Sequence, residues 1–177
     1  QEIFSDILSI FNTHLGMNRG TITLLNPITG ELEIRAAHGM TEEEIGRGKY
    51  LVGEGITGKV VETGEPMVVP QIEKEPLFLN RTQSRENLTK SDISFICVPI
   101  KNGPNVLGAL SVDRLFSEDI AFEEDVRLLS IIASMIAQGL KIQQMVQDEK
   151  KQLLSENITL KEKLKERYSL YNIVGTS

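Results

Sequence analysis

Cysteine and histidine are almost missing from this chain, which narrows the chemistry available to it. Cys97 is the single cysteine among 177 residues, so an internal disulfide is impossible and a reducing compartment, the cytoplasm, is expected. No histidine or cysteine lies at a metal-ligand spacing from His14. We therefore predict no metal site in this piece.

Long apolar runs and an excess of positive charge are also missing. No apolar run approaches the length that spans a bilayer, and no secretory signal stands at the start. The formal net charge is −6 at pH 7, which argues against direct nucleic acid contact by this piece. The length suits one domain followed by a long element. Because the chain begins inside a helical pattern, we expect a longer protein upstream.

Three glycines in the segment VGEGITGKVV, residues 52–61, mark the stretch around which we expect the domain to form. Their spacing matches a dinucleotide fingerprint and most of a phosphate-binding loop. However, Val60 replaces the hydroxyl residue that a phosphate loop needs for magnesium. The helix that follows ends at Gly64 and is too short for a parallel crossover. The pattern therefore predicts a tight entry into a short helix that Thr57 would cap.

The whole pattern predicts an α+β fold, in which helices flank an antiparallel sheet and a long helix follows. Segments with helical periodicity alternate along the chain with segments of strand periodicity, and residues typical of turns separate them. The segments 94–101 and 106–113 are apolar on both faces, so we expect them to be central strands that are covered on each side. We expect helices at 2–15, briefly after Thr41, after Thr57 and from Glu123; strands at 21–26, 31–38, 67–69, 94–101 and 106–113; and a long irregular loop at 71–92.

Strand alternation also predicts which side chains share a face. Alternate residues of 32–38 would lie together, which would let His38 line an interior pocket. Cys97 shares a face with Phe95, and Ser111 shares a face with Asp113. We predict a ligand pocket between the sheet and the long loop, in which a forked arginine would suit a dicarboxylate. The candidate lining residues are Arg81, Cys97, Ser111 and Asp113.

Beyond Lys141 the long helix becomes polar, with neither proline nor glycine through Tyr168. So long a polar helix is not stable alone and needs a partner. A heptad pattern supplies one, because Asn157 at an a position favours a parallel two-stranded coiled coil. We expect a homodimer that also uses the first helix and the helix after Glu123. Its linker residues are Val146, Leu153, Asn157, Leu160 and Leu164.

The order of these elements resembles a GAF domain, which is a ligand-sensing module. Three segments are similar to the Nif-specific regulatory (NifA) family of sigma-54-dependent activators: PLFLNRT at 76–82, SFICVPIK at 94–101 and GALSVDR at 108–114. The final YNIVGTS resembles the opening of the AAA+ ATPase domain of those activators. The resemblance implies a GAF sensor domain at 1–142, a helical coiled-coil linker at 143–170 and the start of a truncated AAA+ domain at 171–177.

This resemblance implies regulation of transcription in nitrogen fixation, and no catalysis by this piece. In the family, the GAF domain binds a small effector or a partner protein and controls assembly and ATPase activity of the AAA+ domain in the same chain. The implied effector is a molecule such as 2-oxoglutarate, and the implied partner is a PII or NifL-type regulator. The full-length protein is expected to be an ATPase, and no cofactor is evident.

Other members of the GAF family have different functions. Free methionine sulfoxide reductases need several cysteines and a tetrapyrrole photoreceptor needs an accessible one, whereas Cys97 stands alone in mid-strand. A cyclic-nucleotide sensor has a motif that Asp113, Phe122 and Asp125 match only loosely. An iron-based gas sensor would use a carboxylate at Asp113, but its cysteine position is Phe95 here. Cyclic-nucleotide binding and iron-based gas sensing are the alternative functions.

Overall fold

The computed structural model of the chain describes residues 2–86, 92–119 and 121–175. The chain falls into two compact units, Gln1–Ala137 and Gln138–Ser177. None of the described helices combines the length and the apolar character needed to cross a membrane.

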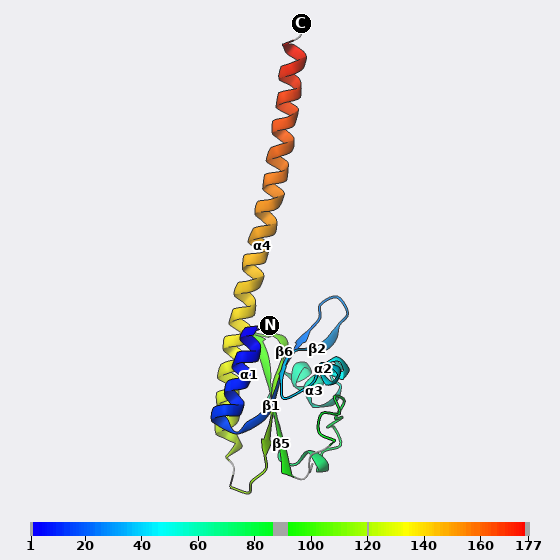
Figure 1. Cartoon of the computed structure of the whole chain (residues 1–177), viewed down its shortest axis with the longest axis vertical. Helices are drawn as coiled ribbons and strands as arrows, with labels where there is room; N and C mark the ends of the chain where they lie inside the picture. The colour runs from blue at the N-terminus through cyan, green and yellow to red at the C-terminus, as the bar shows by residue number, and fades with distance from the viewer. Residues whose placement is uncertain (1, 87–91, 120, 176–177) are drawn as a thin grey trace. The chain divides into compact units, whose positions relative to one another are not determined.

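The first unit is built around a six-stranded antiparallel sheet, which confirms the predicted α+β fold. The strands are β1 (Met17–Leu25), β2 (Glu31–His38), β3 (Lys49–Leu51), β4 (Met67–Val69), β5 (Ile93–Asn102) and β6 (Asn105–Leu115). The helices are α1 (Glu2–Leu15), α2 (Glu42–Arg47), α3 (Gly55–Thr63), α4 (Phe122–Val174) and the short 3-10 helix η1 (Ile72–Lys74). The strand order is β3-β2-β1-β6-β5-β4. Helix α1 and the first turns of α4 lie on one side of the sheet, and α2 and α3 lie on the other (Figure 1).

Each face of the sheet carries its own apolar core. On the side of α1, the helix packs closely against β1, because a Cβ on Gly20 of β1 would lie 2.8 Å from the side chain of Leu8 of α1. Helix α4 contributes the buried residues Leu129, Ala133 and Ile136, which recur at helical spacing. On the side of α3, a second core joins buried residues of four strands, β2, β4, β5 and β6, to that helix and to η1. Its buried members are Leu32, Ile56, Val60, Val61, Val69, Ile72, Ile93, Phe95, Cys97 and Ala109. Burial of an aliphatic or aromatic side chain stabilises the fold by about 1.5–3 kcal/mol.

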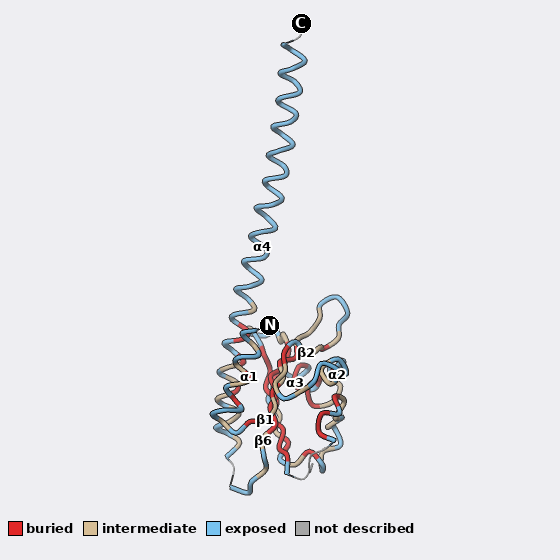
Figure 2. Tube along the Cα trace, viewed as in Figure 1, coloured by how far each residue is buried: buried red, intermediate tan, exposed pale blue. Residues whose placement is uncertain are grey.

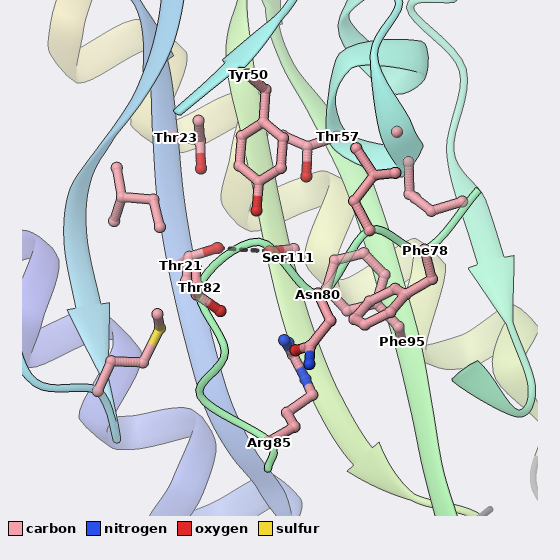
Figure 3. Close-up of a pocket in the computed structure, with 15 residues that line it drawn as sticks. Thr21, Thr23, Tyr50, Thr57, Phe78, Asn80, Thr82, Arg85, Phe95 and Ser111 are labelled. Atoms are coloured by element: carbon pink, nitrogen blue, oxygen red, sulfur yellow. Dashed lines mark hydrogen bonds between the residues drawn. The ribbon is translucent and has the colours of Figure 1, made fainter. Parts of the chain in front are cut away.

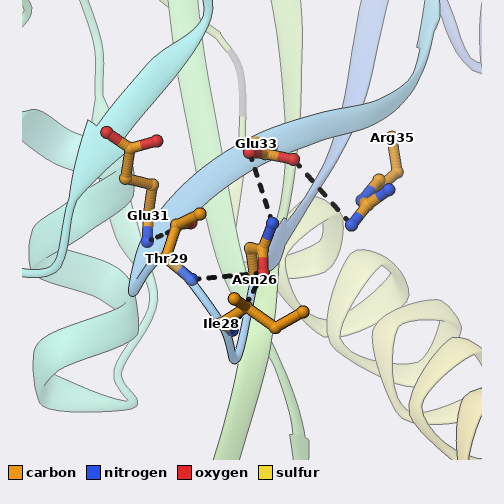
Figure 4. Close-up of polar contacts among 6 residues, drawn as sticks. All are labelled: Asn26, Ile28, Thr29, Glu31, Glu33 and Arg35. Atoms are coloured by element: carbon orange, nitrogen blue, oxygen red, sulfur yellow. Dashed lines mark hydrogen bonds and ion pairs between the residues drawn. The ribbon is translucent and has the colours of Figure 1, made fainter.

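The turn between β1 and β2 forms as its sequence predicts, because Asn26 organises the backbone around it (Figure 4). Its Oδ1 accepts hydrogen bonds from the backbone N–H of Ile28 at 2.9 Å and of Thr29 at 3.4 Å. The Thr29 hydroxyl oxygen in turn accepts the N–H of Glu31 at 3.2 Å. Gly30 has a φ of 74°, a value that glycine adopts without strain.

The second strand departs from simple alternation. The register of β1 against β2 shifts between Ile22 and Thr23, which is a β-bulge. As a result Ile34 lines the interior cavity. His38 instead lies near α1, with its Nε2 3.2 Å from the Nδ2 of Asn12. The prediction that alternate residues of this strand share one face is therefore wrong, and so is the interior position expected for His38.

The helix ends show which of the predicted capping residues form caps in the structure. Helix α2 has the full capping box, in which Thr41 and Glu44 each accept the backbone N–H of the other. Gly64 ends α3 in the left-handed conformation, with φ 69°, as predicted. Thr57 does not cap α3, because the helix begins earlier and Glu54 is the N-cap residue. Strand β3 was not predicted.

The second unit consists of the remainder of α4. The helix is unbroken from Phe122 to Val174, and its residues beyond Lys141 are exposed (Figure 2). Residues 171–174 lie within this helix, and 176–177 fall outside the described residues. The predicted limits of the domain at 1–142, the linker at 143–170 and the AAA+ start at 171–177 stay predictions.

Candidate functional site

A small cavity lies between the sheet and residues 75–86, which we call the cover loop (Figure 3). Strands β1, β5 and β6 form its floor, and Tyr50, the first turn of α3 and the cover loop form its walls. It leaves about 40 Å³ for the centre of a water-sized molecule. That space holds about three waters, or a ligand of a few non-hydrogen atoms. In this conformation it is too small for a nucleotide.

Hydroxyl groups make the floor of the cavity polar. Thr21 and Thr23 lie on the same face of β1, because alternate residues of a strand point the same way. Thr21 pairs with Ser111 of β6, and the two hydroxyl oxygens are 2.5 Å apart. Phe95 of β5 completes this part of the floor with an apolar surface.

Two further polar groups face the cavity from its walls. Burial raises the pKa of Tyr50, although Arg85 and Arg81 oppose the shift, so its phenol stays protonated and can donate a hydrogen bond. Asn80 has a φ of 44° and borders the cavity. Its Oδ1 is buried without a hydrogen-bond partner among the described residues. A buried acceptor of this kind favours a ligand or a water that donates to it.

Arginines hold the cover loop in place. Arg47 of α2 donates from Nε and Nη2 to the carbonyl oxygen of Thr82, at 3.1 and 2.9 Å. Arg81 forms a forked ion pair with Glu54 and also donates to the carbonyl oxygen of Lys49 at 2.7 Å. The hydrogen bonds from Arg81 lower the pKa of the Glu54 carboxyl. The loop is thus fixed to both helices on this side of the sheet.

Arg85 makes the third and most buried of these contacts. Its Nε and Nη2 donate to the two carboxylate oxygens of Asp113, each at 2.6 Å. The guanidinium carbon lies 4.9 Å from the ring centre of Phe78 and 5.6 Å from that of Phe95. Forked pairing and stacking on rings both suit arginine. The guanidinium of Arg85 therefore reaches the cavity already paired with a carboxylate of the chain.

The structure separates the four residues that the sequence proposes as ligand contacts. Ser111 lines the cavity. Asp113 does not line it but pairs with Arg85, which does. Arg81 lies outside the cavity, paired with Glu54. The fourth residue, Cys97, is fully buried in the core and also does not line the cavity. A ligand-binding role for these residues stays a prediction.

Cys97 has an environment that suits packing. Burial raises the pKa of its thiol to about 12, while a hydrogen bond from Thr57 acts in the opposite direction. A thiol that stays protonated is a poor nucleophile and a poor metal ligand.

Arg85 is the functional candidate that sequence reasoning missed. It stands four residues after Arg81 in the same loop, and both side chains could have supplied a forked cation. The one available signal was Asp113, an acidic residue expected on the inner face of a central strand, because a buried carboxylate needs a cation.

The site has the chemistry of a binding pocket. Within residues 2–86, 92–119 and 121–175, no three His, Cys, Asp or Glu side chains gather in a way that could hold a metal ion. Asp113, the carboxylate that an iron site would use, is engaged by Arg85. Hydroxyls, an amide and a guanidinium recognise polar atoms through hydrogen bonds, which suits ligand binding.

The predicted linker residues lie in the second unit. All five are exposed: Val146, Leu153, Asn157, Leu160 and Leu164. Four of them are apolar and recur at heptad spacing, so a single copy of the helix leaves an apolar stripe open to water.

Comparisons with known proteins agree with this architecture. The sequence pattern of the GAF domain matches residues 1–140. The chain is 41% identical over 176 residues to the nitrogen fixation protein VnfA of Azotobacter vinelandii, covering 99% of this chain and 34% of VnfA. It is 38% identical over 173 residues to a Nif-specific regulatory protein of Herbaspirillum seropedicae, covering 97% of this chain and 32% of that protein. The chain therefore spans about a third of the length of these relatives.

A solved structure shows the same fold. The A. aeolicus nlh2 GAF domain, in an inactive state, superimposes with a TM-score of 0.72 at 26% identity, covering 80% of this chain and 85% of that one. The fold of this chain is thus shared with that GAF domain. The chain belongs to the GAF domain family and is similar to the Nif-specific regulators of nitrogen fixation.

Proposed function

We propose that this chain is the sensor region of a Nif-type transcriptional activator, in which the cavity binds a small effector. The observation that carries the proposal is a small cavity lined by hydroxyls, the buried Arg85 guanidinium and Asn80, whose Oδ1 has no hydrogen-bond partner within the described parts of the chain. Polar groups that converge on a cavity are typical of ligand sites. The similarity to Nif-specific regulators supports a role in regulating transcription.

The effector controls an AAA+ domain further along the same protein through helix α4. This helix supplies buried residues to the first unit and continues without a break to Val174. A ligand shifts an equilibrium only by the difference in its affinity for the two states. An effector that binds one arrangement of the sensor better would therefore bias the arrangement of the helix that leaves it.

The linker part of α4 pairs with a second copy of the chain. Support comes from the exposed apolar residues at heptad spacing, and from the single Asn157 that would set a parallel register. A PII or NifL-type protein is a further candidate partner, which would act on the sensor in place of a small molecule or together with one.

Calorimetry on this chain with 2-oxoglutarate, cGMP and cAMP tests the proposal. Binding of 2-oxoglutarate would support an effector-binding sensor. Binding of a cyclic nucleotide would favour the alternative function, and it would require the cover loop to open because the cavity is small. If no compound binds, the result contradicts effector binding by these compounds and favours a sensor that is read by a partner protein or has a purely structural role. Addition of the bound compound to the full-length protein should then change its ATPase rate, whereas an unchanged rate would contradict control of the AAA+ domain.

A further inference from the structure

We infer that Arg85 is the receptor for a carboxylate group of the effector, and that Asp113 moves from Arg85 to Arg19 when the effector binds. The inference rests on the proposed function, because it requires a small molecule in the cavity. The family resemblance already implies a carboxylate effector. The new elements are the receptor role of Arg85 and the role of Arg19, which lies outside the cavity.

The first observation concerns the two sides of the Arg85–Asp113 pair. Arg85 lines the cavity, whereas Asp113 does not. The side chains are 9% and 5% exposed, so the pair is shielded from water. The forked guanidinium matches a carboxylate in shape and charge. A carboxylate that enters the cavity therefore meets the cation that Asp113 approaches from the other side.

The second observation is a buried guanidinium nitrogen of Arg19, near Asp113, that has no hydrogen-bond partner among the described residues. Arg19 of β1 is directly opposite Asp113 of β6 in the strand register. Both residues border a second hollow, together with Asp92 and Arg114. Arg114 is already paired with Asp125. The Nη1 atom of Arg19 is buried and has no hydrogen-bond partner in the described part of the chain.

Together these contacts permit an exchange that leaves no buried charge unpaired. A carboxylate from the effector would replace Asp113 on Arg85, and Asp113 would turn to Nη1 of Arg19, which lacks a hydrogen-bond partner in the described structure. Without Arg19, the displaced Asp113 would be a buried carboxylate without a cation, which is strongly unfavourable. The exchange adds one ion pair to the folded protein and satisfies a donor that is otherwise lost.

The cavity limits the size and chemistry of the carboxylate. Its volume admits only a few non-hydrogen atoms. Thr21 and Ser111 offer hydroxyls that donate or accept, and Asn80 Oδ1 accepts. A short hydroxy or amino acid meets these requirements, because its hydroxyl or ammonium group can donate to Asn80 Oδ1.

Calorimetry with glycolate, lactate and alanine tests the ligand class, with lactamide as the uncharged match for lactate. We expect at least one of the acids to bind, and lactamide to bind about tenfold or more weakly than lactate if lactate binds. Arg19→Gln should lower the affinity for the acid by about tenfold or more, because the displaced Asp113 loses its new partner. Asp113→Asn should raise the affinity for the acid by about tenfold, because the Asp113 carboxylate no longer competes with the acid for Arg85. Arg35→Gln, at an exposed arginine of β2, is the matched control and should change nothing.

The opposite signs distinguish exchange from a structural role. If Arg19→Gln and Asp113→Asn both weaken binding, or if neither changes it, the exchange is wrong although the chain still binds an effector. If no acid binds the unaltered chain, the carboxylate class is wrong, while a response to a nucleotide or a partner protein would keep the proposed function. Should Asp113→Asn fail to fold, Arg19→Gln decides alone, since it leaves the Arg85–Asp113 pair intact.

Discussion

Gly58 shows how closely single residues are fitted at the entry to α3. A Cβ at this position would lie 2.3 Å from the carbonyl oxygen of Leu51. Gly58→Ala should therefore lower the free energy of unfolding by about 1–3 kcal/mol or more, measured by urea denaturation. Gly46→Ala in α2 is the control, because a Cβ there meets nothing within 4 Å, and it should be neutral or stabilising by up to about 1 kcal/mol. Equal losses at the two sites would contradict the argument.

The buried thiol of Cys97 makes stability depend on pH in the alkaline range. Burial raises its pKa from 9.0 to about 12, so between these values the unfolded chain releases a proton that the folded chain keeps. The contribution of the neutral thiol is full below pH 9.0 and declines as pH rises through that window. The advantage in unfolding free energy of the unaltered chain over Cys97→Ala should shrink by about 1 kcal/mol between about pH 8 and about pH 10. A constant difference would show that the thiol ionises equally in both states.

At the scale of elements, the cover loop depends on its arginines. Arg81 links this loop to Glu54 and to the carbonyl of Lys49. Arg81→Gln should speed hydrogen exchange of the backbone amides in residues 77–86 at neutral pH. Arg35→Gln is the control, because its side chain is 46% exposed and forms an ion pair with Glu33 of its own strand at 3.8 Å.

Salt and acid should act on the same contact. The Arg81 and Glu54 side chains are about a third exposed, so added salt screens their attraction and should also speed exchange in the loop. The pKa of Glu54 is lowered below 4.5, so the pair persists above that pH and is lost as pH falls through the lowered value. Exchange that is insensitive to both the substitution and salt would mean that Arg47 and Arg85 hold the loop without Arg81.

Local signals made the elements predictable, and distant partners made the site less so. Helix α1, the Asn26 turn and the Gly64 helix end follow from residues close together in the sequence. Strand β3 escaped prediction because its three residues have no periodicity of their own and form a strand only by pairing with β2. Arg85 was missed because its partner Asp113 lies 28 residues away, and no local pattern distinguishes it from Arg81.

At the scale of the whole molecule, the exposed stripe of α4 predicts the oligomeric state. We expect the chain to sediment as a dimer at micromolar concentration, because a polar helix with apolar heptad positions is stabilised by pairing. Leu153→Asp combined with Leu160→Asp should give a monomer, since both leucines are exposed and would be buried in the pair. Thr159→Asp is the control, one residue away from the stripe. A monomeric parent chain would refute the dimer.

The Asn26–Gly30 turn also offers a site for a fluorescent label. Ile28 is 92% exposed, and its only polar role among the described residues is a backbone N–H that any non-proline residue keeps. A cysteine placed there would be the one thiol open to a maleimide dye, because the natural Cys97 is sealed inside the core. A fluorophore on this turn would follow tumbling and subunit exchange without altering a residue of the cavity.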